Sequence, residues 1–249
     1  MWISCGFGID FIHNIKTQKG LKYQRVYGFV DEWTIYINWG DSIALKDIIL
    51  TNRDVEFLND LYKVNVLNSK RIYKLFGNYK YAMKRLKQLV NHGYIFICGY
   101  LPNREHVYSI TNKGCRCLGK PYLDKNKTAN PHSLACADVY FYLKDRLDYF
   151  ETEKQFDKTF RSDILIQLDN KDILVEVDLS NRRFKEKVKR WEQFYTNGNY
   201  KKYFDIFPPI LIISTNVAKV KADIDSVSNI DLNYSYKEYE IVKEWDYKY

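Results

Sequence analysis

The sequence predicts an α+β protein in which a helical domain with a β-hairpin precedes an α/β domain with a mixed sheet. Two observations lead to this prediction. Three helix-like segments and a strand-turn-strand lie between residues 49 and 120, and helix-like and strand-like segments alternate between residues 131 and 249. Residues 121–130, a polar stretch that opens with a proline, are predicted to link the two domains.

The composition favours a folded protein with an acidic partner. The chain has 249 residues, of which 46% are hydrophobic, and this is enough apolar material for a packed core. Its formal net charge is +8. A surplus of positive charge predicts an acidic partner, most often nucleic acid.

Cysteine usage and the absence of targeting signals predict a soluble cytoplasmic protein. Scattered thiols without zinc-site spacing favour a reducing compartment. The first residues lack the basic n-region of a signal peptide, and no stretch reaches the ~20 apolar residues of a membrane span. The cysteines are Cys5, Cys98, Cys115, Cys117 and Cys136.

Residues 1–48 are rich in aromatic side chains, and the stretch WTIYINW alternates as a strand does. Exposed aromatics at this density would favour aggregation. We therefore expect this segment to form a small β-rich cap on another domain. A protein-binding adaptor that uses this segment is a third and weaker hypothesis for the function of the chain.

Residues 49–120 show the element order of a winged helix-turn-helix domain. Thr51 and Asp54 can form a capping box for a first helix, and Asn68 or Ser69 can cap a second. The segments YIFICGY and HVYSI then flank a turn, and a short helix closes the domain. Three helices followed by a hairpin predict a winged helix that binds DNA. The third helix carries an apolar stripe: Ala82, Leu86, Leu89 and Val90.

Positive charge concentrates in this predicted domain. No Asp or Glu occurs between Leu61 and Arg104, whereas solvated charged faces ordinarily mix signs. Cations on the third helix lie away from its apolar stripe, as contact with phosphates and base edges requires. A partner-protein surface is the alternative to double-stranded DNA. The predicted DNA-binding residues are Lys70, Arg71, Lys80, Lys84, Arg85, Lys87 and Arg104.

Residues 131–249 predict a sheet covered by helices. The long helix has an apolar face that consists of Phe184, Val188, Trp191 and Tyr195. The expected elements are a helix over 131–147, strands over 149–156, 162–168 and 172–178, the long helix over 181–204, the strand PPILIIST, a helix over 216–227 and a strand over 233–242.

Three carboxylates lie at the ends of two predicted strands. Asp163 begins one strand, Glu176 and Asp178 end the next, and the tight turn between them can bring Asp163 and Glu176 together. Two carboxylates at one site repel unless a proton or a metal separates them, and their hard oxygens suit Mg²⁺ or Mn²⁺. We predict a metal site at Asp163 and Glu176, with Asp178 as a further catalytic candidate. The alternative is that the acids pair with arginines: Arg161, Arg182 and Arg183.

The spacing of these acids resembles the PD-(D/E)xK nuclease core, and the element order also resembles that restriction-endonuclease-like fold. Ser162 stands in place of the usual proline, and Asp178 stands in place of the lysine that helps to position or activate the attacking water. A metal at such a site could polarise a phosphodiester. A degenerate site without activity is the other interpretation. A lysine on the next helix could supply the cation, and the candidates are Lys187, preferred because it lies beside the apolar stripe, Lys185 and Lys189.

Three more polar residues accompany these strands. His132 and Asp138 lie on the helix expected over 131–147, but at a spacing of six residues they do not share one helical face. We expect His132, near the start of the helix, to make a local hydrogen bond. Glu153, on the first predicted strand, is a further candidate acid.

Taken together, several segments resemble the replication-relaxation family of bacterial plasmids and integrated mobile elements. That family is similar to mobilisation relaxases with a PD-(D/E)xK-type domain, which implies plasmid replication or transfer. By this resemblance Asp163 and Glu176 match the metal-binding acids. The resemblance extends from about Leu50 to Thr215 and rests on LTNRDVEFLNDLY, AMKRLKQLVNHGYI, VYSITNKG, HSLACADV and DILVEVDLS followed by RFKEKVKRWEQFY.

Two DNA-directed functions rank ahead of the adaptor hypothesis. The first is a metal-dependent DNA-nicking relaxase or nuclease that docks on an origin-like site, with Mg²⁺ or Mn²⁺ at Asp163 and Glu176 and with Lys187 as helper. The second is a non-catalytic DNA-binding replication or regulatory factor that carries a degenerate nuclease domain.

Overall fold

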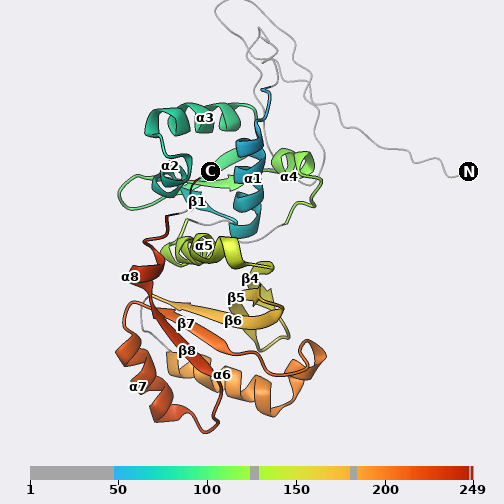
Figure 1. Cartoon of the computed structure of the whole chain (residues 1–249), viewed down its shortest axis with the longest axis vertical. Coiled ribbons are helices and arrows are strands. Elements are labelled where there is room, and N and C mark those ends of the chain that lie inside the picture. Colours follow the sequence, from blue (N-terminus) through green and yellow to red (C-terminus); the bar gives the residue numbers. More distant parts are fainter. Residues whose placement is uncertain (1–47, 124–128, 180–183, 247, 249) are drawn as a thin grey trace, which may run out of the picture. The chain divides into compact units, whose positions relative to one another are not determined.

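The computed structural model describes residues 48–123, 129–179, 184–246 and 248 (Figure 1). The cap predicted for the N-terminal segment therefore lies outside the described residues, except at Ile48. Cys5, Arg182 and Arg183 also lie outside them. None of the helices in the described part is long and apolar enough to cross a membrane.

The first described part consists of helices and a small antiparallel sheet. Thr51 forms the capping box with Asp54, and Asn68 caps the second helix, as the sequence predicts. Asn78, which was not predicted as a cap, accepts a hydrogen bond at the start of the third helix. The sheet has the strand order β1-β3-β2. The elements are α1 (Asn52–Val64), β1 (Leu67–Asn68), α2 (Ser69–Phe76), α3 (Tyr79–Asn91), β2 (Ile95–Tyr100), β3 (His106–Ile110) and α4 (Asn112–Cys117).

The second part contains a five-stranded sheet with the order β4-β5-β6-β7-β8. Strands β4, β5 and β6 pair antiparallel, whereas β6, β7 and β8 pair parallel, so the predicted mixed sheet is confirmed. The strands are β4 (Tyr149–Gln155), β5 (Arg161–Leu168), β6 (Lys171–Asp178), β7 (Ile210–Ser214) and β8 (Tyr234–Glu238). The helices are α5 (Pro131–Leu143), the 3-10 helix η1 (Lys144–Arg146), α6 (Phe184–Thr196), the 3-10 helix η2 (Asn199–Lys202), α7 (Val217–Val227) and α8 (Tyr239–Val242).

Helices cover both faces of this sheet (Figure 1). Ile164, Val175 and Val177 pack on the α5 side, within a buried cluster that also contains residues of α1, α2 and α3. Leu165 and Leu174 pack on the other side with residues of α6 and α7. Successive strand residues point to opposite faces, so the α6 side also receives the residues two positions away from Leu165 and Leu174.

Polar contacts add to the apolar cluster between α1 and the second part. The Tyr140 hydroxyl and the Lys144 ammonium donate to the two carboxylate oxygens of Asp60, at 2.7 and 2.6 Å. The Asn65 amide donates to the Thr152 hydroxyl at 2.7 Å. A shared core and buried hydrogen bonds thus connect the elements on either side of the predicted linker, and the domain boundaries stay a prediction.

Three details of the sequence prediction are wrong. The helix expected over 181–204 ends at Thr196, because Gly198 adopts the left-handed conformation (φ 68°), and a 3-10 turn follows. Phe194, not Tyr195, belongs to the buried face of α6. The strand expected over 233–242 ends at Glu238 and continues as α8.

Candidate functional site

The sheet directs two predicted site acids toward α6. Asp163 is on β5, two residues before Leu165, and Glu176 is on β6, two residues after Leu174. Both leucines pack on the α6 side of the sheet, so strand alternation gives the two carboxylates the same direction. The last paired residues of β5 and β6 are Ile164 and Val175, and the carboxylates lie one position beyond that pair.

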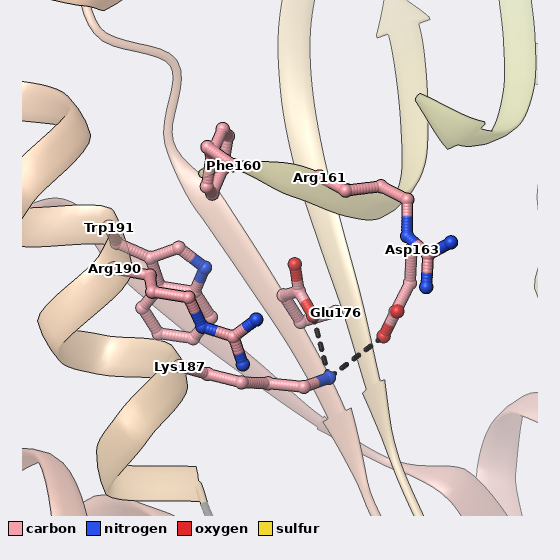
Figure 2. A pocket seen from close by; sticks show the side chains of 7 residues that line it. All are labelled: Phe160, Arg161, Asp163, Glu176, Lys187, Arg190 and Trp191. Atoms are coloured by element: carbon pink, nitrogen blue, oxygen red, sulfur yellow. Dashed lines mark hydrogen bonds and ion pairs between the residues drawn. The ribbon is translucent and has the colours of Figure 1, made fainter. Parts of the chain in front are cut away.

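Lys187 of α6 joins the two carboxylates (Figure 2). Its Nζ lies 3.0 Å from Oδ2 of Asp163 and 2.8 Å from Oε2 of Glu176. The buried face of α6, with Phe184 and Val188, fixes the helix on the sheet and leaves Lys187 at its margin. The structure therefore brings Asp163, Glu176 and Lys187 together, as predicted, while their catalytic roles stay a prediction.

The other lysines that were considered for this role lie elsewhere. Lys185 is exposed, and its ammonium is 3.7 Å from a carboxylate oxygen of Asp223 on α7. Lys189 is exposed on the same helix. Only Lys187, among the lysines of α6, contacts the two acids in the described structure.

Asp163 has two more partners at the site. The backbone N–H of Val177 donates to its Oδ2 at 3.0 Å, and His132 Nε2 lies 3.3 Å from its Oδ1. His132 is the second residue of α5, so its contact reaches beyond the local hydrogen bond that the sequence suggests. Glu153 lies in β4 between residues that pair with β5 on either side of Asp163, and its φ of 54° marks an irregularity there.

Asp178 is buried at the end of β6, where it pairs in register with Ser214 of β7. It is absent from the residues that line the pocket at the carboxylate pair. The position that holds lysine in the PD-(D/E)xK pattern thus has no cation in this chain. The Lys187 ammonium contributes a positive charge from the neighbouring helix instead.

Burial and mutual contact strongly perturb the three ionisable groups. Burial opposes the ionisation of Asp163, but His132 and Lys187 outweigh this effect and hold its pKa well below the usual range. Burial, together with the negative charge of Asp163, raises the pKa of Glu176 to about 8. Burial alone would lower the pKa of Lys187, yet the two acids raise it. At neutral pH the pair therefore favours an ionised Asp163, a protonated Glu176 and a cationic Lys187.

Figure 2 shows the side chains that line a pocket at this site. The volume of the pocket is about 170 Å³. Two arginines flank the acids there. Arg161 was predicted only as a neutralising partner, and Arg190 was not predicted, although it lies three residues after Lys187, a spacing that places two residues on one helical face. The lining residues are Phe160, Arg161, Asp163, Glu176, Lys187, Arg190 and Trp191.

The carboxylate oxygens at this site are ligands that suit a divalent metal, but the described residues supply too few of them to surround the ion completely. No group of three or more His, Cys, Asp or Glu side chains in the described ranges is arranged to hold a metal ion. Asp163 and Glu176 supply two carboxylates, and Mg²⁺ commonly uses one or two carboxylates and keeps several waters. These residues could hold Mg²⁺ or Mn²⁺ if the ion takes the position beside the Lys187 ammonium.

The titration of Glu176 predicts how metal binding depends on pH. A metal binds the ionised carboxylate, and the raised pKa of Glu176 means that binding must release its proton. We expect the affinity for Mn²⁺ to rise with pH, by up to about tenfold per unit below a pKa of about 8. Calorimetric titration of the wild-type protein and of Glu176→Gln at several pH values checks this. Equal affinity at all pH values in the wild-type protein would contradict it.

The predicted DNA-binding cations divide into two groups in the structure. Five have exposed side chains, and Arg104 lies at the turn between β2 and β3. Ala82, Leu86 and Leu89 form the buried face of α3, as predicted. The exposed cations are Lys70, Lys80, Lys84, Lys87 and Arg104.

Arg71 and Arg85 instead pair with buried carboxylates. Arg85 donates to both oxygens of Asp54, at 2.8 and 2.6 Å, and Arg71 donates to both oxygens of Asp138, at 2.7 and 2.5 Å. Asp54 and Asp138 are almost fully buried, so these ion pairs hold the arginines in place. The structure gives both arginines a structural task that the charge pattern did not reveal.

Comparison of the sequence with known proteins identifies a family to which the chain belongs. The family model described as replication-relaxation matches residues 58–210, more than half of the chain. A comparison with curated proteins finds no match. Protein VC1899 from Vibrio cholerae, a solved structure, aligns with 78% of this chain and 51% of its own, at 9% identity and a TM-score of 0.32. The chain thus spans about half the length of that protein, and a similarity this low supports no inference.

Proposed function

This chain belongs to the replication-relaxation family, and from that premise we propose that it binds DNA and nicks it with a divalent metal during plasmid or mobile-element replication or transfer. The observation that carries the proposal is that the ammonium of Lys187 contacts the carboxylates of both Asp163 and Glu176. A lysine beside two acids is the set of groups that a PD-(D/E)xK-type site requires, and here the lysine comes from α6.

The charges of these groups suit phosphodiester hydrolysis. A bound Mg²⁺ or Mn²⁺ would polarise the phosphate and lower the pKa of a coordinated water. The Lys187 ammonium could orient the attacking water or stabilise negative charge that develops on the phosphate oxygens. His132 contacts the oxygen of Asp163 that Lys187 leaves free, and so could fix the orientation of that carboxylate.

The arrangement of α1, α2, α3 and the β2–β3 hairpin supports a winged helix as the DNA-binding module. In this proposal α3 is the recognition helix, since it packs one face on the core and exposes Lys80, Lys84 and Lys87 on others. Arg104 at the hairpin turn would contact a phosphate or a minor groove.

Charge reversal on α3 is expected to weaken DNA binding. Each cation that neutralises a phosphate contributes about 0.9 to the slope of log affinity against log salt, so Lys84→Glu with Lys87→Glu should reduce that slope by about 2 and the affinity by tenfold or more. Fluorescence anisotropy with duplex DNA across a salt series measures both quantities.

The matched control reverses two exposed cations outside α3, Lys171→Glu with Lys201→Glu. If the control weakens binding as much as the α3 variant does, net charge explains the effect and the recognition-helix assignment is wrong. Arg85 is unsuitable for this test, because its replacement would leave the buried Asp54 carboxylate without its arginine partner.

The nicking activity itself is tested with supercoiled plasmid, with and without Mg²⁺ or Mn²⁺. We expect the wild-type protein to convert supercoiled into open-circular DNA only when metal is present. Glu176→Gln should abolish this conversion, because an amide replaces the anionic ligand while the shape of the side chain is kept. Binding to DNA should persist in the variant, since Glu176 lies on β6 and not on the helical module, which consists of α1, α2, α3 and the β2–β3 hairpin.

A non-catalytic DNA-binding factor is the second candidate. One observation favours it: the Lys187 ammonium already contacts both acids, so they have a cationic partner without a metal. Under this alternative the plasmid stays supercoiled in the presence of metal, while salt-sensitive DNA binding remains. The plasmid assay therefore separates the two candidates.

A further inference from the structure

Two arginines stand on either side of the carboxylate pair in the pocket (Figure 2). Arg161 precedes Asp163 by two residues on β5, so strand alternation places both on the same face of the sheet. Arg190 follows Lys187 by three residues on α6, so both lie on one side of that helix. Strand β5 and helix α6 thus each contribute one arginine to the pocket that contains the two acids.

Neither guanidinium is engaged by a carboxylate. In the described part of the chain, Arg161 and Arg190 form no ion pair, and the Nε of Arg190 donates only to the backbone oxygen of Glu186 at 3.3 Å. Both side chains are exposed. Arg71 and Arg85, in contrast, use their guanidinium groups on buried carboxylates. The pocket arginines therefore retain donors for a ligand.

The balance of charge makes this pocket attractive to an anion. Three cations (Arg161, Lys187 and Arg190) face two acids (Asp163 and Glu176), which leaves a net charge of +1 even when both acids are ionised. A bound divalent metal would add further positive charge.

The size of the pocket limits the part of the ligand that enters it. A volume of about 170 Å³ corresponds to roughly six water molecules at ~30 Å³ each. Phe160 and Trp191 also line the pocket, but each is only 2% exposed, so their rings are covered and are not available to stack on a base. A phosphate group fits this volume, whereas a whole nucleotide does not.

We propose that Arg161 and Arg190 form a clamp for the phosphodiester that is to be cut, with one guanidinium for each side of the phosphate. This inference rests on the proposed function, since it names the group of the DNA that the site receives. Guanidinium groups bind phosphate oxygens in a bidentate manner, and two of them from different elements fix both position and orientation. The clamp holds the phosphorus beside Asp163, Glu176 and Lys187.

The experiment uses the full chain and the double variant Arg161→Gln with Arg190→Gln, beside the matched control Lys171→Gln with Lys201→Gln. Both pairs remove two exposed positive charges, but the control pair lies outside the pocket. Affinity for one fixed duplex DNA is measured across a salt series with Ca²⁺ in place of Mg²⁺. We expect the clamp variant to lose about one unit of salt slope relative to the control, because one phosphate contact is lost.

A slope equal to that of the control would overturn the clamp, whatever the nicking activity. A reduced slope supports it even if the wild-type protein fails to nick, in which case the proposed cleavage fails and the phosphate site stands. With Mg²⁺ and saturating DNA, the clamp variant should nick at least about thirtyfold more slowly than the control. A loss of this order is expected when one contact that stabilises charge in the transition state is removed. Arg161→Lys with Arg190→Lys should keep the slope and still nick slowly, since lysine preserves charge but not bidentate geometry.

Discussion

Replacement of Lys187 by methionine is expected to lower the rate of metal-dependent nicking by about a hundredfold or more, with DNA affinity almost unchanged. Methionine keeps the approximate length of the side chain and removes its charge. The substitution removes the ammonium that lies 3.0 Å from Asp163 and 2.8 Å from Glu176. In the described structure no other cation contacts both acids.

The loss should appear in the chemical step. Lys187 lies on α6, away from α3, so its removal leaves the exposed cations of the helical module in place. Single-turnover nicking at saturating DNA measures the rate of cleavage, and anisotropy measures binding. A large loss of rate without a loss of affinity identifies an interaction made at the site of cleavage.

Lys189→Met is the matched control, because Lys189 is an exposed lysine on the same helix. We expect it to nick at the wild-type rate. Equal rates for Lys187→Met and wild type would mean that the Lys187 contact only neutralises the acids, and the catalytic reading of this lysine would be wrong. Thermal unfolding of both variants at neutral pH excludes misfolding as the cause of a lost rate.

The element order and the main carboxylates could be predicted from the sequence, because both depend on local pattern. The caps at Thr51 and Asn68 and the alternation in β5 and β6 are encoded within a few residues. The tight turn between β5 and β6 is also local, and it brings Asp163 close to Glu176. The proximity of Lys187 followed from its place beside the apolar stripe of α6.

The ionic partners could not be predicted, because they join residues far apart in the chain. Asp54 and Arg85 are separated by 31 residues, and Arg71 and Asp138 by 67. A charge pattern predicts where cations concentrate but not which of them meet a buried acid after folding. The same limit hid the contact between His132 and Asp163, since it depends on how α5 crosses the sheet.

Asp138 is the centre of a buried polar group that these long-range contacts create. Arg71 donates two hydrogen bonds to it from α2, at 2.7 and 2.5 Å. The Tyr239 hydroxyl donates to Oδ2 at 2.6 Å, and Trp245 Nε1 donates to Oδ1 at 2.9 Å. Four donors from three segments thus meet one carboxylate that is 2% exposed.

Substitution of Asp138 by alanine is therefore expected to destabilise the protein strongly. It removes the acceptor of all four hydrogen bonds and leaves the Arg71 guanidinium, which is largely buried, without its counter-charge. Removal of one partner of a buried ion pair costs about 3–5 kcal/mol, which corresponds to a fall in melting temperature of roughly 10 °C for a domain of this size. Thermal and urea unfolding measure the loss.

Asp145→Ala is the control, because Asp145 is an exposed aspartate just beyond the end of α5. Its melting temperature should stay within about 2 °C of wild type, as for most surface substitutions. Asp138→Asn should lie between the two, since the amide oxygen still accepts from Tyr239 or Trp245 but carries no charge for Arg71. If Asp138→Ala and Asp145→Ala melt together, the hydrogen bonds to Asp138 contribute nothing to stability. A selective loss would instead show that the hydrogen bonds that join α2 and the C-terminal segment to Asp138 of α5 stabilise the fold, in addition to the apolar core that these parts share.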